Sequence, residues 1–242
     1  MRGATLEKIA AAACPERQAV VLEIGPGKGA LTRPLLARCD RLFAVELDAG
    51  LAARLREQYA SEPRFTLLEG DVLALDFAAL GAAVVCGNLP YYITSPIIER
   101  TLTAGGGALQ HAVFLVQKEV AERIAAAPGS RDYGYFSAFV QFHARPELLF
   151  TVPPGAFAPP PKVDSAVIRL TLDPAAPRLG IADPAAFLKF LQSAFAHKRK
   201  TLRNNLAGIF GKAAVDAHPE AGLRAEQLSL PQFAALYQRL IS

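Results

Sequence analysis

Short apolar runs alternate with helix-like segments through the first two thirds of the chain, and this alternation restricts the fold more than any other feature. The apolar runs are bounded by Gly, Asp or Asn and have the length of buried strands; they are residues 19–24, 42–45, 65–68, 83–86 and 113–116. The helix-like segments between them are residues 31–37, 51–59 and 97–102. Such alternation predicts an α/β fold, in which helices cover both faces of a parallel sheet. Two later runs, 148–152 and 163–172, are expected to add an antiparallel hairpin at one edge.

The pattern changes at residues 173–177, where Asp-Pro-Ala-Ala-Pro interrupts any strand or helix and predicts a linker. Beyond it, residues 184–196, 198–209 and 231–241 have helical spacing with no strand between them. Asp183 is placed to cap the first of these helices, with Pro184 at its first position. We therefore expect a sheet domain over residues 1–176 and a small all-helical domain over residues 177–242.

The bulk properties indicate an intracellular protein. The 242 residues contain three cysteines, Cys14, Cys39 and Cys86, which are far apart and lack the spacing of a zinc site, so we expect no metal and a reducing cytoplasmic environment. Neither a signal peptide nor a run of about 18 apolar residues is present, which argues against a membrane protein. Nothing in the sequence requires a dimer, and we expect a monomer.

Positive charge is concentrated in the C-terminal part. The net charge is +4, and residues 178–242 hold nine basic and four acidic side chains, so the rest of the chain is close to neutral. This asymmetry suggests a polyanionic partner, although a solvated helical face would also explain it.

The first predicted strand ends in a glycine-rich turn, Glu-Ile-Gly-Pro-Gly-Lys-Gly over residues 23–29. Gly25 and Gly27 allow the backbone to turn tightly and to approach a ligand without Cβ interference. The third glycine comes too early for the dinucleotide pattern, and the acidic Glu23 does not favour a pyrophosphate. Taken alone, such a turn is often only structural.

Acidic residues follow the next two strands. Glu46 lies at the end of the second strand, where a carboxylate can accept both hydroxyl protons of a ribose. Asp71 follows the third strand and can accept a hydrogen bond from an adenine amino group, while Val72 offers its backbone N–H. Taken alone, either acid is equally consistent with an exposed surface residue or a helix-capping residue. Together with the glycine turn, they predict a phosphate-free adenosyl ligand, of which S-adenosylmethionine is the common one.

The fourth strand leads into Gly-Asn-Leu-Pro-Tyr-Tyr over residues 87–92. The exocyclic N6 of adenine is a poor nucleophile, and two acceptors aimed at its hydrogens, the Asn88 side chain and a carbonyl near Pro90, would favour the pyramidal geometry needed for attack. Tyr91 can stack on the purine. An isolated Asn-Leu-Pro-Tyr would be only a turn, but its position after the fourth strand predicts a site for methyl transfer to a base that has left its stack.

These segments resemble the ribosomal RNA adenine N6,N6-dimethyltransferase family, and in particular its bacterial kasugamycin-sensitivity branch. The resemblance covers nearly the whole chain and is carried by residues 21–32, 45–48, 70–71, 88–95, 116–123, 133–137, 152–170 and 197–206. Its most specific blocks are Pro-Pro-Gly-Ala-Phe-Ala-Pro-Pro-Pro-Lys-Val-Asp-Ser from residue 153 and His-Lys-Arg-Lys-Thr-Leu-Arg-Asn-Asn-Leu from residue 197.

The resemblance implies a Rossmann-like S-adenosylmethionine-dependent methyltransferase sheet with a helical C-terminal domain. It implies dimethylation of two adjacent adenosines in the 3′-terminal hairpin of 16S rRNA, and with it a role in ribosome biogenesis. The positions that it carries over to the cofactor are Gly25, Glu46, Asp71 and Asn88, and those that it carries over to the methyl-transfer centre are Asn88, Pro90 and Tyr91. Phe157 becomes either a second aromatic wall for the flipped base or a plug between its loop and the core.

We expect RNA contacts from Lys162 and from four basic residues of the last block, Lys198, Arg199, Lys200 and Arg203. The spacing of these four prevents them from sharing one helical face, so some of them should reach phosphate or solvent. The family usually begins with a longer segment that contains a Gln-Asn-Phe-Leu block over the cofactor, whereas this sequence starts at Met1 within the helix expected after that block. We therefore expect this chain to bind S-adenosylmethionine weakly.

Three other functions are compatible with parts of the pattern. An antibiotic-resistance methyltransferase of large-subunit rRNA shares the Asn-x-Pro-Tyr site, but it typically lacks the Pro-Pro-Pro-Lys-Val-Asp-Ser run in this form. A non-catalytic ribosome-assembly factor would not need intact Asn88, Pro90 and Tyr91. A nicotinamide-dependent oxidoreductase is disfavoured by the spacing of the glycines.

Overall fold

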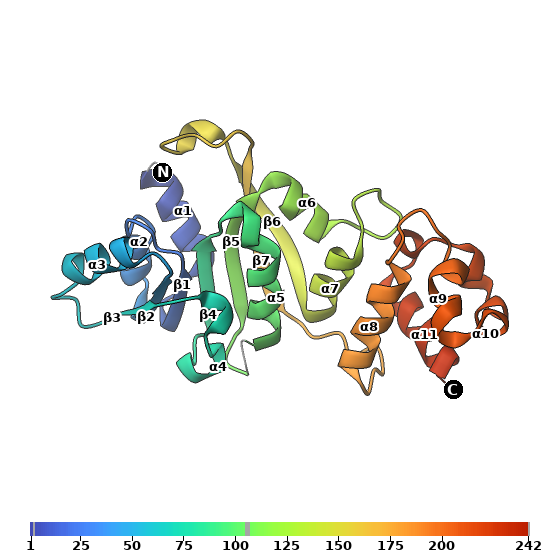
Figure 1. Cartoon of the computed structure of the whole chain (residues 1–242). Helices are drawn as coiled ribbons and strands as arrows, with labels where there is room; N and C mark the ends of the chain where they lie inside the picture. Colours follow the sequence, from blue (N-terminus) through green and yellow to red (C-terminus); the bar gives the residue numbers. More distant parts are fainter. Residues whose placement is uncertain (2, 105–106, 242) are drawn as a thin grey trace. The chain divides into compact units, whose positions relative to one another are not determined.

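The chain folds into two compact units, as shown by a computed structural model that describes residues 1, 3–104 and 107–241 (Figure 1). The first unit comprises Met1–Ala121 and Arg145–Leu172, and the second comprises Glu122–Ala144 and Asp173–Ser242. The chain passes between the units three times, and the last passage, after Leu172, falls at the start of the expected linker. The segment Glu122–Ala144, however, belongs to the second unit, although a single cut after residue 176 would leave it with the sheet.

The first unit is built on a seven-stranded sheet of order β3-β2-β1-β4-β5-β7-β6. The strands are β1 (Gln18–Ile24), β2 (Cys39–Glu46), β3 (Phe65–Glu69), β4 (Val84–Asn88), β5 (His111–Gln117), β6 (Ala144–Val152) and β7 (Ser165–Leu172). Strands β1 to β5 pair in parallel, and β7 pairs antiparallel with β5. All five expected parallel strands are therefore confirmed, and the two later runs lie side by side at one edge.

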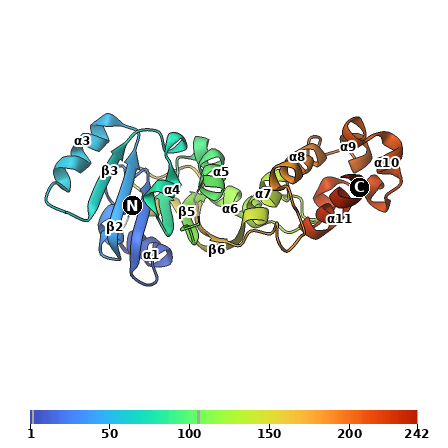
Figure 2. The ribbon, with the colours of Figure 1, turned by 90° about the horizontal axis from the view of Figure 1, so that it is seen from below.

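Helices cover both faces of this sheet. Figures 1 and 2 show α1 (Gly3–Ala13) and α5 (Thr94–Ala104) on opposite sides of β4 and β5. Buried side chains of α1 and α2 (Thr32–Leu36) form one apolar cluster with β1, β2, β4, β5 and β7. The remaining elements of the first unit are α3 (Ala49–Gln58), α4 (Phe77–Leu80) and the 3₁₀ turns η1 (Val72–Ala74), η2 (Tyr91–Ile93) and η3 (Pro154–Ala156), and α6 (Lys118–Ala125) leads into the second unit.

Helix α1 is fixed to the sheet through its last carbonyls. Arg169 of β7 donates to the Ala12 oxygen at 2.8 Å, and His111 Nε2 lies 2.7 Å from the Ala13 oxygen. These carbonyls have no partner within the helix, so side chains from two strands satisfy acceptors that would otherwise be lost on burial.

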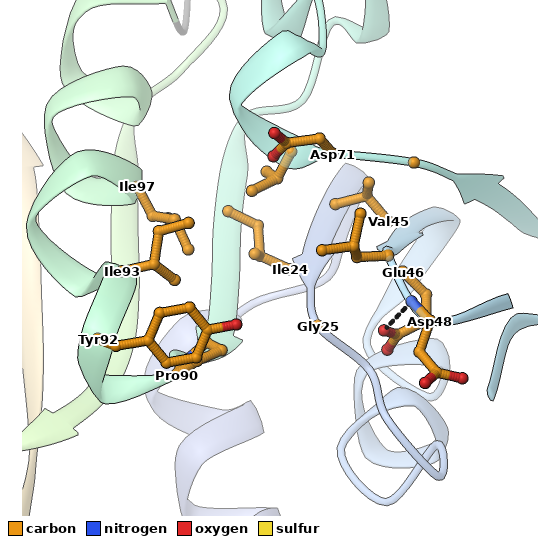
Figure 3. Close-up of a pocket in the computed structure, with 13 residues that line it drawn as sticks. Ile24, Gly25, Val45, Glu46, Asp48, Asp71, Pro90, Tyr92, Ile93 and Ile97 are labelled. Carbon is orange, nitrogen blue, oxygen red and sulfur yellow. Dashed lines mark hydrogen bonds between the residues drawn. The ribbon is translucent and has the colours of Figure 1, made fainter. Parts of the chain in front are cut away.

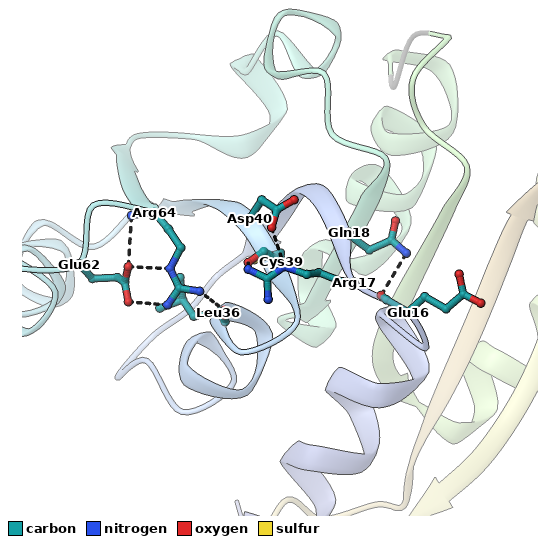
Figure 4. A network of polar contacts seen from close by, with 8 residues as sticks. All are labelled: Glu16, Arg17, Gln18, Leu36, Cys39, Asp40, Glu62 and Arg64. Carbon is teal, nitrogen blue, oxygen red and sulfur yellow. Dashed lines mark hydrogen bonds and ion pairs between the residues drawn. The ribbon is translucent and has the colours of Figure 1, made fainter.

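The edge where the parallel strands begin is held by polar contacts (Figure 4). Arg17 pairs with Asp40 at 2.6 Å and donates to the Cys39 oxygen at 3.0 Å, and Arg64 pairs with Glu62 at 2.7 Å while it reaches the Leu36 oxygen at 2.9 Å. The loops at this edge are therefore tied down, and the loops at the opposite edge are the ones left to bind ligands.

The second unit is helical and has an aromatic core. Its helices are α7 (Tyr135–His143), α8 (Pro184–Ala194), α9 (Leu202–Phe210), α10 (Lys212–Asp216) and α11 (Leu230–Ile241), with the 3₁₀ turns η4 (Pro219–Gly222) and η5 (Ala225–Gln227). Phe187 and Phe190 of α8 pack against Tyr237 of α11, with ring centroids 5.4 and 5.2 Å apart. Asp183 caps α8 as expected, because its side chain accepts the Ala186 amide at 3.0 Å.

The expected helix over residues 198–209 starts later than its spacing predicts. Helix α9 begins at Leu202, and Lys198, Arg199 and Lys200 lie in the preceding turn. The reason is a set of contacts distant in sequence: Thr201 forms a bridge with Arg224, and the Leu202 amide donates to the Leu223 oxygen at 2.8 Å. Within the described part of the chain, no helix is long and apolar enough to span a bilayer.

Candidate active site

The glycine turn after β1 leaves an open backbone surface. Gly25 and Gly27 have φ values of 63° and 60°, in the left-handed region that favours glycine, and a Cβ built on either would meet no atom within 4 Å. Gly29, at φ 77°, instead packs closely against Leu55 and Tyr59. The first two glycines are therefore required by backbone conformation, and the space above them is available to a ligand.

Glu46 connects this turn to the end of β2. The residue is 7% exposed, and its two carboxylate oxygens accept hydrogen bonds from the amides of Gly27 and Asp48, each at 3.0 Å. A carboxylate oxygen accepts more than one hydrogen bond, so the group keeps acceptor capacity for a ligand while two amides fix its direction. The position of Glu46 at the strand end thus agrees with the role expected for it.

Asp71 follows β3 and caps the turn η1. One of its oxygens, Oδ1, accepts the Leu73 amide at 2.9 Å, and the exposed side chain makes no other hydrogen bond within the described residues. The structure therefore supports both readings of this residue: it is a cap, and it retains a free carboxylate oxygen.

A cavity of about 460 Å³ brings these loops together (Figure 3). It is lined by Ile24, Gly25, Val45, Glu46, Leu47, Asp48, Gly70, Asp71, Val72, Pro90, Tyr92, Ile93 and Ile97. We call it the adenosyl cavity, after the ligand that the sequence leads us to expect there. Its volume is in the range of small-molecule sites, and its walls combine apolar side chains with a few carboxylates, as ligand pockets commonly do.

A second cavity, of about 330 Å³, shares Gly25 with the first. We call it the base cavity, after the purine that the sequence leads us to expect beside Asn88. Asn88, the last residue of β4, and Phe157, from the loop after η3, both border it, as do Glu23, Gly27 and Lys28. Asn88 is exposed, and its side chain makes no hydrogen bond within the described residues, so its carboxamide is free to bind. The two cavities therefore meet at the glycine turn, because Gly25 borders both of them.

Glu23 is the buried acid of the base cavity. Its side chain is 1% exposed and accepts a hydrogen bond from the Thr32 hydroxyl at 2.7 Å. Burial raises the pKa of this carboxyl to about 8, an effect that the Thr32 hydrogen bond opposes and the nearby Glu46 reinforces. A carboxyl with this pKa is largely protonated at neutral pH.

Sequence reasoning did not single out Gly87, which governs the distance between β1 and β4. A Cβ on Gly87 would lie 2.5 Å from the Ile24 carbonyl oxygen, a contact that backbone atoms cannot relieve by rotating. The available signal was a glycine inside a strand, directly before Asn88, which commonly marks a close approach between backbones.

The turn after Asn88 places its residues differently. Pro90 borders the adenosyl cavity, and its carbonyl already accepts the Thr94 hydroxyl at 3.0 Å and the Ile93 amide at 3.2 Å. Tyr91 borders neither cavity; its hydroxyl lies 3.0 Å from the Ser165 hydroxyl of β7. Tyr92, which sequence reasoning passed over, borders the adenosyl cavity.

The expected RNA contacts are divided between the units. Lys162 is exposed in the loop before β7 of the first unit. In the second unit, Lys198 Nζ donates to the Arg131 oxygen at 2.6 Å, and Arg203 pairs with Asp216. The side chains of Arg199 and Lys200 are exposed and make no hydrogen bond or ion pair within the described residues.

Comparisons with known proteins find relatives along nearly the whole chain. A family model described as "Ribosomal RNA adenine dimethylase" matches residues 3–241. The "Ribosomal RNA small subunit methyltransferase A" of Acidobacterium capsulatum is 51% identical over 230 residues, which cover 91% of this chain and 81% of that protein. The protein of the same name from Bordetella petrii is 45% identical over 240 residues, which cover 98% and 90% of the two chains.

Two solved structures share the fold. A dimethyladenosine transferase from Plasmodium falciparum superposes with a TM-score of 0.81 at 23% identity, over 98% of this chain and 95% of that one. The 23S rRNA methyltransferase ErmE superposes with a TM-score of 0.72 at 25% identity, over 100% and 99%. The fold is thus the Rossmann-like methyltransferase sheet with a helical C-terminal part. With a family match over nearly its full length and relatives at this identity, the chain belongs to the ribosomal RNA adenine dimethylase family.

Proposed function

We propose that this protein transfers methyl groups from S-adenosylmethionine to the N6 atoms of two adjacent adenosines in the 3′-terminal hairpin of 16S rRNA. One observation carries the proposal: the adenosyl cavity, with Glu46 and Asp71, meets the base cavity, with Asn88, at Gly25. A donor and an acceptor held on the two sides of one open glycine turn would have their reacting atoms close together.

The residues of the adenosyl cavity fit the cofactor. Glu46, already oriented by two amides, would accept the ribose hydroxyls, and Asp71 would use its free oxygen for the adenine amino group, next to the backbone of Val72. Gly25 and Gly27 leave open space for the chain that joins the adenosyl group to the amino acid end. S-adenosylmethionine supplies a methyl group on a positively charged sulfur, which needs no activation by the protein.

The protein's task is then to position the amine. The Asn88 side-chain oxygen would accept one N6 hydrogen and draw the nitrogen toward pyramidal geometry, which releases its lone pair from the purine ring. The Pro90 carbonyl is already used by Thr94 and Ile93, so we assign the second acceptor to the neighbouring Leu89 carbonyl. Pro90 itself would shape the turn and the wall of the adenosyl cavity.

Aromatic side chains would hold the flipped base. Tyr91 is 37% exposed, and the contact between its hydroxyl and Ser165 fixes the ring in one orientation, so that a base can stack on it without first ordering it. Base–aromatic stacking contributes about 1–3 kcal/mol per base. Phe157 is half-buried against the core and also borders the base cavity, so it can fill the gap between its loop and the core and still contact the flipped base.

The choice of small-subunit rRNA is supported by the relatives. Proteins named for the small subunit are 43–51% identical to this chain, whereas ErmE, named for 23S rRNA, is 25% identical. We propose action on a small ribosomal subunit in the cytoplasm, by a monomer, with a role in ribosome biogenesis.

The test is a transfer assay. Small and large subunits that lack the modification are incubated with the protein and labelled S-adenosylmethionine, and the methylated nucleotides are mapped. We expect dimethylation at two adjacent adenosines near the 3′ end of 16S rRNA. Methylation of 23S rRNA would establish the antibiotic-resistance alternative, and cofactor-independent subunit binding without transfer would establish an assembly factor.

A substitution of Asn88 tests its proposed role as acceptor for an N6 hydrogen. Asn88→Ala removes the proposed acceptor and should lower kcat by about 10²–10³-fold, the usual loss for one oriented polar group in an active site. Gln58→Ala is the matched control, because it removes an exposed carboxamide at the end of α3, outside both cavities. Equal rates for the two variants would contradict the assignment of Asn88.

A further inference from the structure

The turn η2 carries two consecutive tyrosines whose surroundings differ. Tyr91 is held by Ser165 through its hydroxyl and borders neither cavity. Tyr92 is 85% exposed, makes no hydrogen bond within the described residues, and borders the adenosyl cavity. The two rings therefore serve different surfaces, although they are adjacent in the chain.

The Tyr92 ring forms part of one wall of the adenosyl cavity (Figure 3). It lies beside Pro90 and Ile93, and its hydroxyl end points toward the side of the cavity that Gly25 and Asp48 form. This wall is apolar over Pro90, Ile93 and Ile97, whereas the carboxylates lie at the strand ends across from it.

Among the described residues, the two most exposed large hydrophobic side chains both border this cavity. Tyr92 is 85% exposed, and Leu47, between the acids at the end of β2, is 67% exposed. Where exposed apolar groups border one cavity, they indicate a ligand-binding surface more often than a packing defect. A flat, largely apolar ring system bound in this cavity would contact both side chains and remove them from water.

We propose that Tyr92 is a cofactor-binding residue, whose ring covers the adenosyl group of S-adenosylmethionine from the side opposite the Gly25 turn. This inference rests on the proposed function, which supplies the cofactor. Under this inference the two tyrosines of η2 have different partners: Tyr92 contacts the methyl donor, whereas Tyr91, which borders neither cavity, remains the proposed stacking partner of the flipped base. The ring supplies the contact, so phenylalanine should replace Tyr92 and alanine should not.

The test is calorimetric titration of the full chain with S-adenosylhomocysteine, which has the same adenosyl group and is chemically inert. Tyr92→Ala should raise Kd by about tenfold, the effect of one aromatic contact on a bound ring. Tyr92→Phe should remain within about twofold of the parent protein. Because the side chain is exposed, neither substitution should change the melting temperature, which circular dichroism would check.

Tyr91→Ala is the matched control, because it removes the neighbouring ring from the same turn. It should leave the Kd of S-adenosylhomocysteine within about twofold and should instead lower methyl transfer to RNA. Equal Kd values for Tyr92→Ala and the parent protein would overturn the inference, as would equal losses in Tyr92→Phe and Tyr92→Ala. If the parent protein itself binds no S-adenosylhomocysteine, the inference fails, whereas the proposed function is judged separately by the transfer assay on ribosomal subunits.

Discussion

At the scale of single residues, Glu23 shows how burial can give an acid a property that its sequence position does not reveal. The sequence places a carboxylate two positions before a glycine turn, where a charged group would be unremarkable. The fold buries it beside Thr32 and near Glu46, and this environment raises the pKa of Glu23 to about 8. The ionised form is therefore disfavoured in the folded protein.

This shift predicts a specific pH dependence of stability. The folded pKa of Glu23 lies above the ordinary value of 4.5, so its stabilising contribution is complete below about pH 4.5 and is lost as the pH rises toward 8. Glu23→Gln keeps an acceptor for the Thr32 hydroxyl but cannot ionise. The variant should therefore gain stability relative to the parent protein between pH 5 and 8, by on the order of 3 kcal/mol in total. Urea unfolding at several pH values measures this difference.

Glu62→Gln provides the control for that experiment. The hydrogen bond from Arg64 lowers the pKa of Glu62, so this carboxylate stabilises the fold when it is ionised, which is the opposite sign. Glu62→Gln should thus gain nothing relative to the parent protein as the pH rises. If Glu23→Gln and Glu62→Gln show the same pH profile, the assigned state of Glu23 is wrong.

At the scale of elements, the close approach of β1 and β4 places the Gly25 turn next to Asn88. Gly87→Ala would put a Cβ 2.5 Å from the Ile24 carbonyl oxygen and push the two strand ends apart. We expect a loss of about 1–3 kcal/mol in the free energy of unfolding, together with weaker binding of S-adenosylhomocysteine. Gly208→Ala in helix α9 meets no atom within 4 Å and should stabilise the protein slightly, so the same chemical change has opposite effects at the two sites.

The sequence predicted the strands well, because parallel strands buried on both faces are continuous apolar runs between turn residues. It also placed Gly25, Glu46 and Asp71 together, since parallel strands end at one edge of a sheet. It did not predict the start of α9, which depends on Leu223 and Arg224, residues distant in sequence. Nor did it distinguish the environments of two adjacent tyrosines, because the partner that orients Tyr91 is Ser165 on another strand.

At the scale of the whole molecule, the excess of positive charge in residues 178–242 divides into charges with partners and charges without. Lys198 is tied to the Arg131 carbonyl, and Arg203 is paired with Asp216. Arg199 and Lys200 extend from a turn that Asn205 braces, since its side chain donates to the Ala194 oxygen at 2.6 Å and to the His197 oxygen at 3.3 Å. If the two free cations bind phosphate, as the sequence leads us to expect, the bracing of the turn lowers the entropy cost of that binding.

This division predicts how binding to rRNA depends on salt. Each phosphate that a side chain neutralises contributes about 0.7–0.9 to the slope of log K against log salt concentration. Replacing both Arg199 and Lys200 by Gln should therefore reduce the slope by about 1.4–1.8 in filter-binding assays over a series of KCl concentrations.

Lys198→Gln is the matched single-charge control. Its main consequence should be a less ordered turn, which lowers affinity at every salt concentration and changes the slope little. A slope that fell as much for Lys198→Gln as for the double variant would show that Lys198 leaves its carbonyl to bind RNA, and an unchanged slope in the double variant would place the phosphate contacts elsewhere on the surface.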